Sequence, residues 1–592
     1  MVWAPHREKV AVHLFGTHER CITMTKNHWG YHQALVSDIE AQSRYLYRLD
    51  DSHEYPDPAS RYQPDGVHGP SEIFNLGAFH WTDTDWRAPS LEESIFYEVH
   101  VGTYSPQGSL DSLCAYLPEL AGLGVTTIEL MPVAQFPGSR NWGYDGVYPF
   151  AVQNSYGGPL ALQRFVNAAH AHGLAVALDV VYNHLGPEGN YLDQFGPYFT
   201  DRYRTPWGQA INFDGPQSGP VRRFLIENAL YWFEQYHIDV LRLDAIHGIF
   251  DFGAFHFLAE LETQVQLAGK RLGRDLLLIA ESDLNDARVL LPCEKGGYAL
   301  PAQWSDDFHH SLHALLTRET NGYYADFGGL HHLARVLREG WFYQGQYSTF
   351  RRRRHGNSPR GIPRSHFVVS SQNHDQVGNR ARGERLSTLV NLEAQKVAAG
   401  MTLLSPCVPL LFMGEEYGEP APFLYFTSHG DRDLVEAVRR GRRREFSQFG
   451  WNDDIPDPQD EATFAKSRLQ QHLRDNGSHR VLRFFYQELI RFRRANHLGA
   501  YAELEVMENQ SLHVLTLFRG APGPRLLMIF NFSTNEVELK SVIPTAHWTI
   551  ELNSADSRWL GPGDRFSRTV GPTNAVKLPG HSFVVLRHED GD

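Results

Sequence analysis

From about residue 94, the chain repeats a pattern of a short apolar run, a polar turn and a segment with apolar residues three or four positions apart. Continuous apolar runs predict strands buried on both faces, and the wider spacing predicts helices with one apolar face. The clearest helix is 221–236, where Val221, Leu225 and Ala229 recur at four-residue spacing. This alternation of strand and helix is typical of parallel βαβ units.

Eight strands can be counted in this region, of which the sixth has the weakest pattern. They are residues 95–100, 127–131, 175–179, 240–244, 277–281, 303–305, 367–370 and 409–413. Eight strands alternating with helices predict a closed (β/α)8 TIM barrel, a multidomain α/β architecture when other domains are attached. In such barrels the active site lies at the carboxyl ends of the strands, so polar residues at those ends are the first functional candidates.

Both ends of the chain show a different, strand-only pattern. Short alternating segments such as 10–14 and 44–49 predict an N-terminal β-sandwich, and the segments after residue 500 predict a C-terminal one. We therefore predict a β-sandwich over 1–90, the barrel over 91–499 and a second β-sandwich over 500–592.

Composition excludes several classes of protein. The net charge of −14 is unfavourable for a nucleic-acid partner, and no apolar run approaches the roughly 20 residues needed to cross a membrane. The run 351–355 contains four arginines, which we interpret as a solvated loop. The four cysteines form no metal-binding or disulfide pattern, so we expect reduced, buried thiols. With no secretory signal at residues 1–5, we expect a cytoplasmic protein.

Charged residues end several of the predicted barrel strands. Asp179 ends the third strand, Arg242 and Asp244 lie on the fourth, Glu281 ends the fifth and Asp375 follows the seventh. Side chains alternate along a strand, so Arg242 and Asp244 share a face, and Asp179 on the neighbouring strand can approach Arg242. An arginine beside Asp244 favours its ionised form. These charges are either a salt-bridge network that holds the barrel or a catalytic group.

Glycoside hydrolysis with retention needs two carboxyl groups about 5 to 5.5 Å apart, one as nucleophile and one as acid. Asp244 and Glu281 on adjacent strands suit these roles. The apolar surroundings of Glu281 are expected to raise its pKa, as a general acid requires. We find no zinc-protease helix, phosphate-binding loop or serine-hydrolase elbow in the sequence.

Four motifs in this order resemble the signature regions of the α-amylase superfamily: DVVYNH at 179–184, LRLDA at 241–245, IAE at 279–281 and QNHD at 372–375. The resemblance implies that Asp244 is the nucleophile, Glu281 the acid/base and Asp375 the residue that binds sugar hydroxyls in the transition state. It also implies that Arg242 orients the nucleophile.

Three further residues bind the sugar before the cleaved bond, if the resemblance holds. His184 and His374 would donate hydrogen bonds to it and Tyr144 would stack on it. The plainer alternatives are two core histidines and a loop aromatic residue. One branch of the superfamily binds calcium through the position of Asn183, but no acidic cluster accompanies it here, so we expect no metal and no cofactor.

Within the superfamily, nearly the whole chain resembles the enzymes that release trehalose from maltooligosyl-trehalose, notably in residues 373–379 and in the insert around Trp207. Glycogen branching enzymes, which transfer glucan instead of hydrolysing it, are the nearest rival, and a non-catalytic glucan-binding protein is the alternative from another class. The expected partners are maltooligosyl-trehalose and related α-glucans. Trp207 and His247 are expected to shape the acceptor side, unless Trp207 only supports its loop. We expect a monomer or a weak homo-oligomer.

Overall fold

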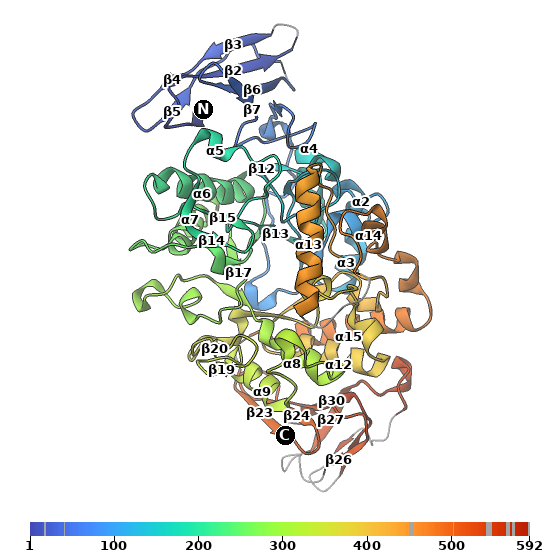
Figure 1. Ribbon diagram of the computed structural model, residues 1–592. Coiled ribbons are helices and arrows are strands. Elements are labelled where there is room, and N and C mark those ends of the chain that lie inside the picture. Colours follow the sequence, from blue (N-terminus) through green and yellow to red (C-terminus); the bar gives the residue numbers. More distant parts are fainter. Residues whose placement is uncertain are drawn as a thin grey trace.

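The computed structural model describes residues 1–16, 19–40, 42–448, 455–500, 502–539, 547–563, 569–570 and 575–589. Two N-terminal sheets lie at one end of the molecule, the barrel occupies the middle, and the C-terminal sheets lie at the other end (Figure 1). The fold class predicted from the sequence is therefore confirmed. The domain boundaries at residues 90 and 499 stay predictions.

The barrel is closed by eight parallel strands, which match the eight predicted from the sequence. They are β9 (Phe96–Val99), β10 (Thr127–Leu130), β13 (Ala175–Val180), β16 (Val240–Leu243), β17 (Leu277–Ala280), β18 (Ala302–Trp304), β21 (Phe367–Ser370) and β22 (Val408–Phe412). Nearly every residue in them is buried, because helices cover the outside and side chains fill the inside.

The helices of the described residues follow the strands or form inserts between them. They are α1 (Val101–Tyr104), α2 (Leu110–Cys114), α3 (Leu117–Leu123), α4 (Gly158–Ala171), α5 (Leu192–Phe195), α6 (Ser218–Gln235), α7 (Phe257–Leu272), α8 (Asp306–Thr317), α9 (Leu330–Glu339), α10 (His374–Gly378), α11 (Leu386–Leu389), α12 (Leu392–Leu404), α13 (Arg432–Gln448), α14 (Glu461–Lys466) and α15 (Gly477–Ala495). Figure 1 shows α13 as a long helix in front of the middle of the molecule.

Strand register places the charged residues of the barrel. Asp179 on β13 pairs with Arg242 on β16. The ladder continues past the ends of the strands, because the amide of Asp244 donates to Val180 at 3.0 Å and the amide of Glu281 donates to Leu243 at 3.0 Å. The backbones of both carboxylates are therefore fixed by the sheet and not by a free loop.

The N-terminal region contains two antiparallel sheets, as the alternating segments predict. One has the order β1 (Val2–Trp3), β5 (Tyr31–Gln33), β4 (Thr25–Lys26), and the other contains β3 (Arg20–Thr23), β2 (Val10–Phe15), β6 (Arg44–Leu49), β7 (His53–Tyr55) and β8 (Ser71–Glu72). The indole of Trp3 packs edge-on against Tyr198, with the ring centroids 5.2 Å apart. This aromatic contact joins the N-terminal sheets to an insert of the barrel.

The C-terminal region is a six-stranded antiparallel sheet with a two-stranded sheet packed on it. The larger sheet has the order β23 (Leu504–Asn509), β24 (Val514–Arg519), β25 (Leu526–Asn531), β30 (Ser582–His588), β27 (Trp548–Asn553), β28 (Thr569–Val570), and the smaller one pairs β26 (Val537–Leu539) with β29 (Val576–Leu578). Along β25, Leu527 and Ile529 pack towards the small sheet, whereas Met528 and Phe530 belong to the core shared with the barrel. The two-residue period of the strand produces both interfaces.

The cysteines are distributed differently from the prediction. The prediction of buried thiols is wrong for Cys21 and Cys293, which are exposed because they lie at a sheet edge and in a surface turn; Cys407 is buried, and all four are unpaired. None of the helices described is long and apolar enough to span a membrane.

Candidate active site

A cavity of about 610 Å³ opens where the carboxyl ends of the barrel strands meet. Nine of the residues that the sequence singled out come from six separate segments of the chain, and the structure brings these nine to this one cavity. They are Tyr144, His184, Trp207, Arg242, Asp244, His247, Glu281, His374 and Asp375.

Arg242 is the centre of the charge network. Its Nη1 donates to both oxygens of Asp179 at 3.0 and 2.9 Å and to Oδ1 of Asp244 at 2.8 Å, and its Nη2 lies 3.7 Å from Oε2 of Glu281. The guanidinium also covers the ring of Trp304 at 4.4 Å. Burial lowers the pKa of Arg242, but the surrounding acids outweigh it and hold that pKa above its usual value. One buried, permanent cation therefore touches both carboxylates proposed for the reaction.

Asp244 is held from two sides. Arg242 binds its Oδ1, and the amide nitrogen of Asn183 donates to its Oδ2 at 3.0 Å. These two bonds fix the plane of the carboxylate and satisfy both oxygens. The side chain of Asn183 is thus bonded to the nucleophile candidate. Among the described residues, no group of three or more histidine, cysteine or acidic side chains could hold a metal ion.

The surroundings of Glu281 favour its protonated form. Burial raises the pKa of its carboxyl, Arg242 lowers it, and the nearby Asp244 raises it, with a net shift upward. The backbone amide of Ala245 donates to Oε2 at 2.5 Å, which orients the carboxyl towards the strand that carries Asp244. The raised pKa expected from the sequence is confirmed.

Asp375 lies in the first turn of α10, directly after β21. Its Oδ1 accepts a 2.6 Å hydrogen bond from the amide nitrogen of Asn379, one helical turn further on. Asn379 in turn accepts a 3.1 Å bond from Nη1 of Arg442, whose Nη2 donates to the carbonyl of Gly378 at 2.9 Å. A residue of α13 thus reaches the turn that presents Asp375.

Tyr144 and His374 form a hydrogen-bonded chain on the other side of the cavity. The Tyr144 hydroxyl donates to Asp179 at 2.7 Å and lies 2.8 Å from Nε2 of His374, whose Nδ1 lies 2.5 Å from Glu98. Burial lowers the pKa of His374, but the Glu98 carboxylate outweighs it and raises that pKa above its usual value. A protonated His374 donates from both nitrogens, which satisfies Glu98 and Tyr144 together.

Trp207 lies in the turn between β14 (Phe199–Thr205) and β15 (Gly208–Ile211). Its ring stacks on His184 with centroids 5.3 Å apart and lies 5.9 Å from the ring of His247. Although it packs on these residues, Trp207 is still 43% exposed. Part of its ring is therefore accessible to a ligand in the cavity.

Several residues that line the cavity were not identified from the sequence. Asp283, Asp306, Asn379 and Tyr425 line the cavity, together with Leu434, Val438 and Arg442 from α13. Asp306 follows the sixth strand. Glu281 was selected because it ends an apolar strand, and the same criterion would have selected Asp306 if the apolar pattern of the sixth strand were clearer. Burial and the charge of Glu281 raise the pKa of Asp306 well above its usual value.

The interpretation of 351–355 as a solvated loop is wrong for Arg351. Its side chain is only 11% exposed, and its Nη2 forms a 3.1 Å ion pair with the cavity residue Asp283. The guanidinium also lies over the ring of Tyr343 at 5.2 Å. The loop folds back onto the barrel, a long-range contact that a run of arginines does not predict.

Comparison with known proteins agrees with this geometry. The model of the alpha amylase catalytic domain matches residues 60–206. Malto-oligosyltrehalose trehalohydrolases from Saccharolobus solfataricus and Arthrobacter ramosus are each 46% identical to the chain, over 91% and 88% of its length and 91% and 93% of theirs.

A solved structure and a more distant relative are also similar to the chain. The crystal structure of a putative alpha amylase from Salmonella typhimurium is 37% identical, covers 99% of this chain and 97% of its own, and superposes with a TM-score of 0.89. A 1,4-alpha-glucan branching enzyme from Pseudoalteromonas atlantica is 24% identical over 93% of this chain and 74% of its own. The chain has the barrel and the charge network described above, and it is similar to malto-oligosyltrehalose trehalohydrolases over nine tenths of its length. It therefore belongs to the malto-oligosyltrehalose trehalohydrolase family of α-amylase-type glycosidases.

Proposed function

We propose that this protein is a retaining glycoside hydrolase that cleaves the α-1,4-glucosidic bond next to the terminal trehalose of maltooligosyl-trehalose, releasing trehalose and a maltooligosaccharide. The observation that carries the proposal is the contact of one buried arginine, Arg242, with both Asp244 and Glu281 in a cavity of sugar size. Family membership supplies the substrate class.

In the first step Asp244 attacks the anomeric carbon of the glucosyl unit and Glu281 gives its proton to the departing oxygen of trehalose. The glycosidic bond breaks, trehalose leaves as an alcohol, and a covalent ester joins the maltooligosyl chain to Asp244. The raised pKa of Glu281 keeps its proton available, and Arg242 stabilises the ionised nucleophile.

In the second step the Glu281 carboxylate takes a proton from water, and the water oxygen attacks the same anomeric carbon. The ester breaks, Asp244 is restored as a carboxylate, and two inversions leave the product with the original α configuration. Asp375 binds ring hydroxyls as positive charge develops on the sugar. Tyr144 stacks on that sugar. His184 and His374 bind its hydroxyls by exchanging the contacts that their Nε2 atoms make with the carbonyl and the hydroxyl of Tyr144 for hydrogen bonds to the sugar.

The acceptor side distinguishes hydrolysis from branching, because both reactions share the first step. Trp207, with one face on His184 and one face free, and His247 behind it are proposed to contact the trehalose unit. The identity to the branching enzyme, 24%, is about half of that to the trehalohydrolases, which favours hydrolysis.

Product analysis tests the proposal. The protein is incubated with maltooligosyl-trehalose and, separately, with a linear maltooligosaccharide, and the products are resolved by chromatography. Trehalose release is the expected result. New α-1,6 branches without trehalose would favour the branching reaction, and binding without any product would favour a non-catalytic protein.

We also propose a cytoplasmic protein that is a monomer or a weak homo-oligomer. The four unpaired cysteines, two of them exposed, suit a reducing compartment. Cell fractionation tests the location, and sedimentation over a hundredfold concentration range tests the oligomeric state.

A further inference from the structure

We propose that the protein has a second α-glucan-binding site, outside the catalytic cavity, between the β4–β5 turn of the N-terminal region and helix α6. The choice of ligand rests on the proposed function. The site is a cavity of about 620 Å³, similar in size to the catalytic one, and the two cavities share no lining residue. Its walls come from two parts of the chain, which Figure 1 shows side by side.

Trp29 forms the outer edge of this cavity and is 69% exposed. A large apolar ring in water is unfavourable, and such residues often mark a binding site. Its turn is rigid: the side-chain oxygen of Asn27 accepts from the amide of Trp29 at 2.9 Å and from that of Tyr31 at 3.0 Å. The indole of Trp3 donates to the carbonyl of Trp29 at 3.2 Å. These bonds hold the backbone of the turn, and the Trp29 ring lies 4.8 Å from the ring of His28.

The opposite wall is the exposed face of α6. Arg223 and Glu227 form an ion pair one turn apart, with Nε and Oε1 separated by 3.1 Å, and both are largely exposed. Phe224 between them packs on Phe150 and Tyr198 at centroid distances of 5.2 and 5.3 Å. Tyr31 faces this wall: burial raises the pKa of its hydroxyl, while the charge of Arg223 opposes the rise.

This combination of groups suits a neutral sugar chain. Aromatic faces pack against the C–H faces of glucose rings, and a few polar groups at the edge bind hydroxyls and set the orientation. Arg223 donates, Glu227 accepts, and the amide nitrogen of Asn27 has no partner among the described residues, because the turn uses only its oxygen. The lining contains two basic side chains, Arg61 and Arg223, and two acidic ones, Asp57 and Glu227, so neither sign of charge dominates its side chains.

The position of the second site indicates its role in binding long substrates. A maltooligosyl chain held at Trp29 keeps the remainder of the same substrate at a high local concentration near the barrel. The consequence is limited to long chains, because a short one cannot occupy both cavities. We therefore expect Trp29 to affect KM for long glucans and not the chemical step.

The test uses the full chain carrying Glu281→Gln, so that glucan binds without turnover, and titrates it with maltoheptaose by calorimetry. Two classes of site are expected, and adding Trp29→Ala should weaken one of them by about tenfold or more. Phe484→Ala, which removes another half-exposed aromatic side chain, on α15, is the matched control. In the active protein, Trp29→Ala should raise KM for long substrates and leave kcat/KM for maltotriosyl-trehalose unchanged.

Each outcome is decisive. If Trp29→Ala leaves both classes of site unchanged, or if it lowers turnover of the short substrate or the melting temperature, the proposed site is overturned while the catalytic proposal stands. If maltoheptaose does not bind at all and trehalose is not released by the active protein, the proposed function fails, and the second site fails with it.

Discussion

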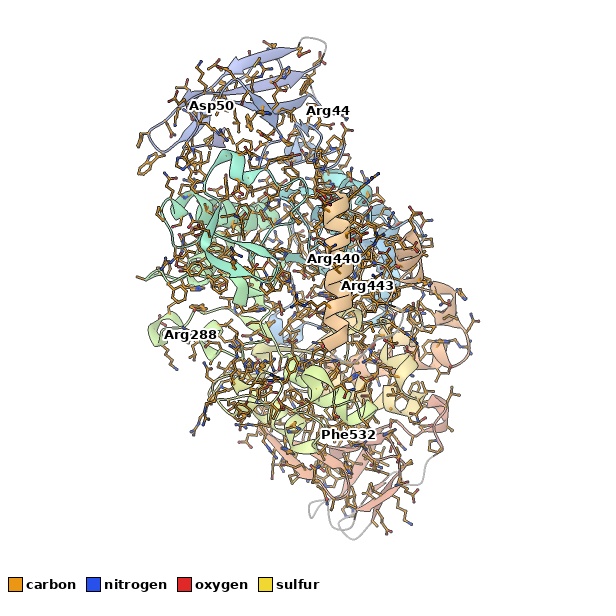
Figure 2. All side chains as sticks on the ribbon, in the orientation of Figure 1. Arg44, Asp50, Arg288, Arg440, Arg443 and Phe532 are labelled. Carbon is orange, nitrogen blue, oxygen red and sulfur yellow. The ribbon has the colours of Figure 1, made fainter. Side chains whose placement is uncertain are left out.

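The guanidinium of Arg442 on α13 donates a 3.1 Å hydrogen bond to the side-chain oxygen of Asn379, and the amide nitrogen of Asn379 donates a 2.6 Å bond to Asp375. Leu434, Val438 and Arg442 recur at four-residue spacing and line the cavity, whereas Arg440 and Arg443, which Figure 2 labels on the same helix, are exposed. One face of α13 therefore both closes the cavity and fixes a catalytic candidate.

We predict that Arg442 is a positioning residue for Asp375. Arg442→Ala removes the group that orients Asn379, and the resulting displacement of Asp375 should lower kcat by roughly 10- to 100-fold with a smaller change in KM. Arg442→Lys should recover part of the rate. Arg440→Ala, an exposed arginine two positions away, is the control and should behave as the unmodified protein. Equal rates for the two alanine variants would refute the role.

The pH dependence should report Glu281. A general acid works only when protonated, so activity is present below its pKa and is lost as the pH rises through it. Because burial raises the pKa of Glu281 above the ordinary value of 4.5, kcat/KM should persist to a higher pH than an exposed glutamic acid would allow. The profile of kcat/KM against pH checks this, and an alkaline limb centred near 4.5 would contradict it.

Replacing Glu281 separates chemistry from binding. Glu281→Gln keeps the shape of the side chain but has no proton to give, so turnover should fall by orders of magnitude while the affinity for substrate is largely retained. Single-turnover rates and calorimetric titration measure the two effects. Unchanged turnover would remove Glu281 from the mechanism.

The roles of the two carboxylates can be distinguished with azide and an α-maltotriosyl fluoride donor. In Asp244→Ala, azide takes the place of the nucleophile and displaces fluoride with one inversion, which gives the β-azide. In Glu281→Ala, Asp244 first displaces fluoride, and azide then displaces Asp244, which gives the α-azide after two inversions. Proton NMR of the anomeric position identifies each product, and exchanged configurations would mean that the roles are exchanged.

Trp207 should determine preference for the trehalose end. Trp207→Ala removes the exposed face beside His184 and should lower kcat/KM for maltooligosyl-trehalose by about tenfold or more, with less effect on a linear maltooligosaccharide. Trp207→Phe should retain most of the preference. If both substrates lose equally, Trp207 only supports its loop.

The barrel could be predicted because all of its strands except the weak sixth are local apolar runs, and Asp244 and Glu281 could be predicted because they end such runs. α13 could not. Its sequence is rich in arginine, and nothing local to it indicates that Leu434 and Val438 cover a cavity built mostly by strands far away in the sequence. Arg351 shows the same limit, since its ion pair with Asp283 depends on how a long loop folds back.

A last prediction concerns stability at the junction of the barrel and α15. Arg493 is buried, and its guanidinium donates to the carbonyls of Leu403 at 2.9 Å, Ser405 at 2.7 Å and Cys407 at 2.6 Å. Leu403 lies in the last turn of α12, where carbonyls have no partner within the helix, and a cation there also complements the helix dipole. The side chain of Arg493 thus caps the carboxyl end of α12 although Arg493 itself lies on α15.

Arg493→Met fills similar space but donates no hydrogen bond, so it leaves buried carbonyls unpaired at about 1–3 kcal/mol each, partly relieved by water. We expect a clear fall in the unfolding temperature, with kcat unchanged well below it. Arg494→Met is the matched control, because its exposed side chain makes only a 3.3 Å bond to the carbonyl of Gly124. Similar melting curves for the two variants would show that the three carbonyls find other donors and that Arg493 does not hold this junction.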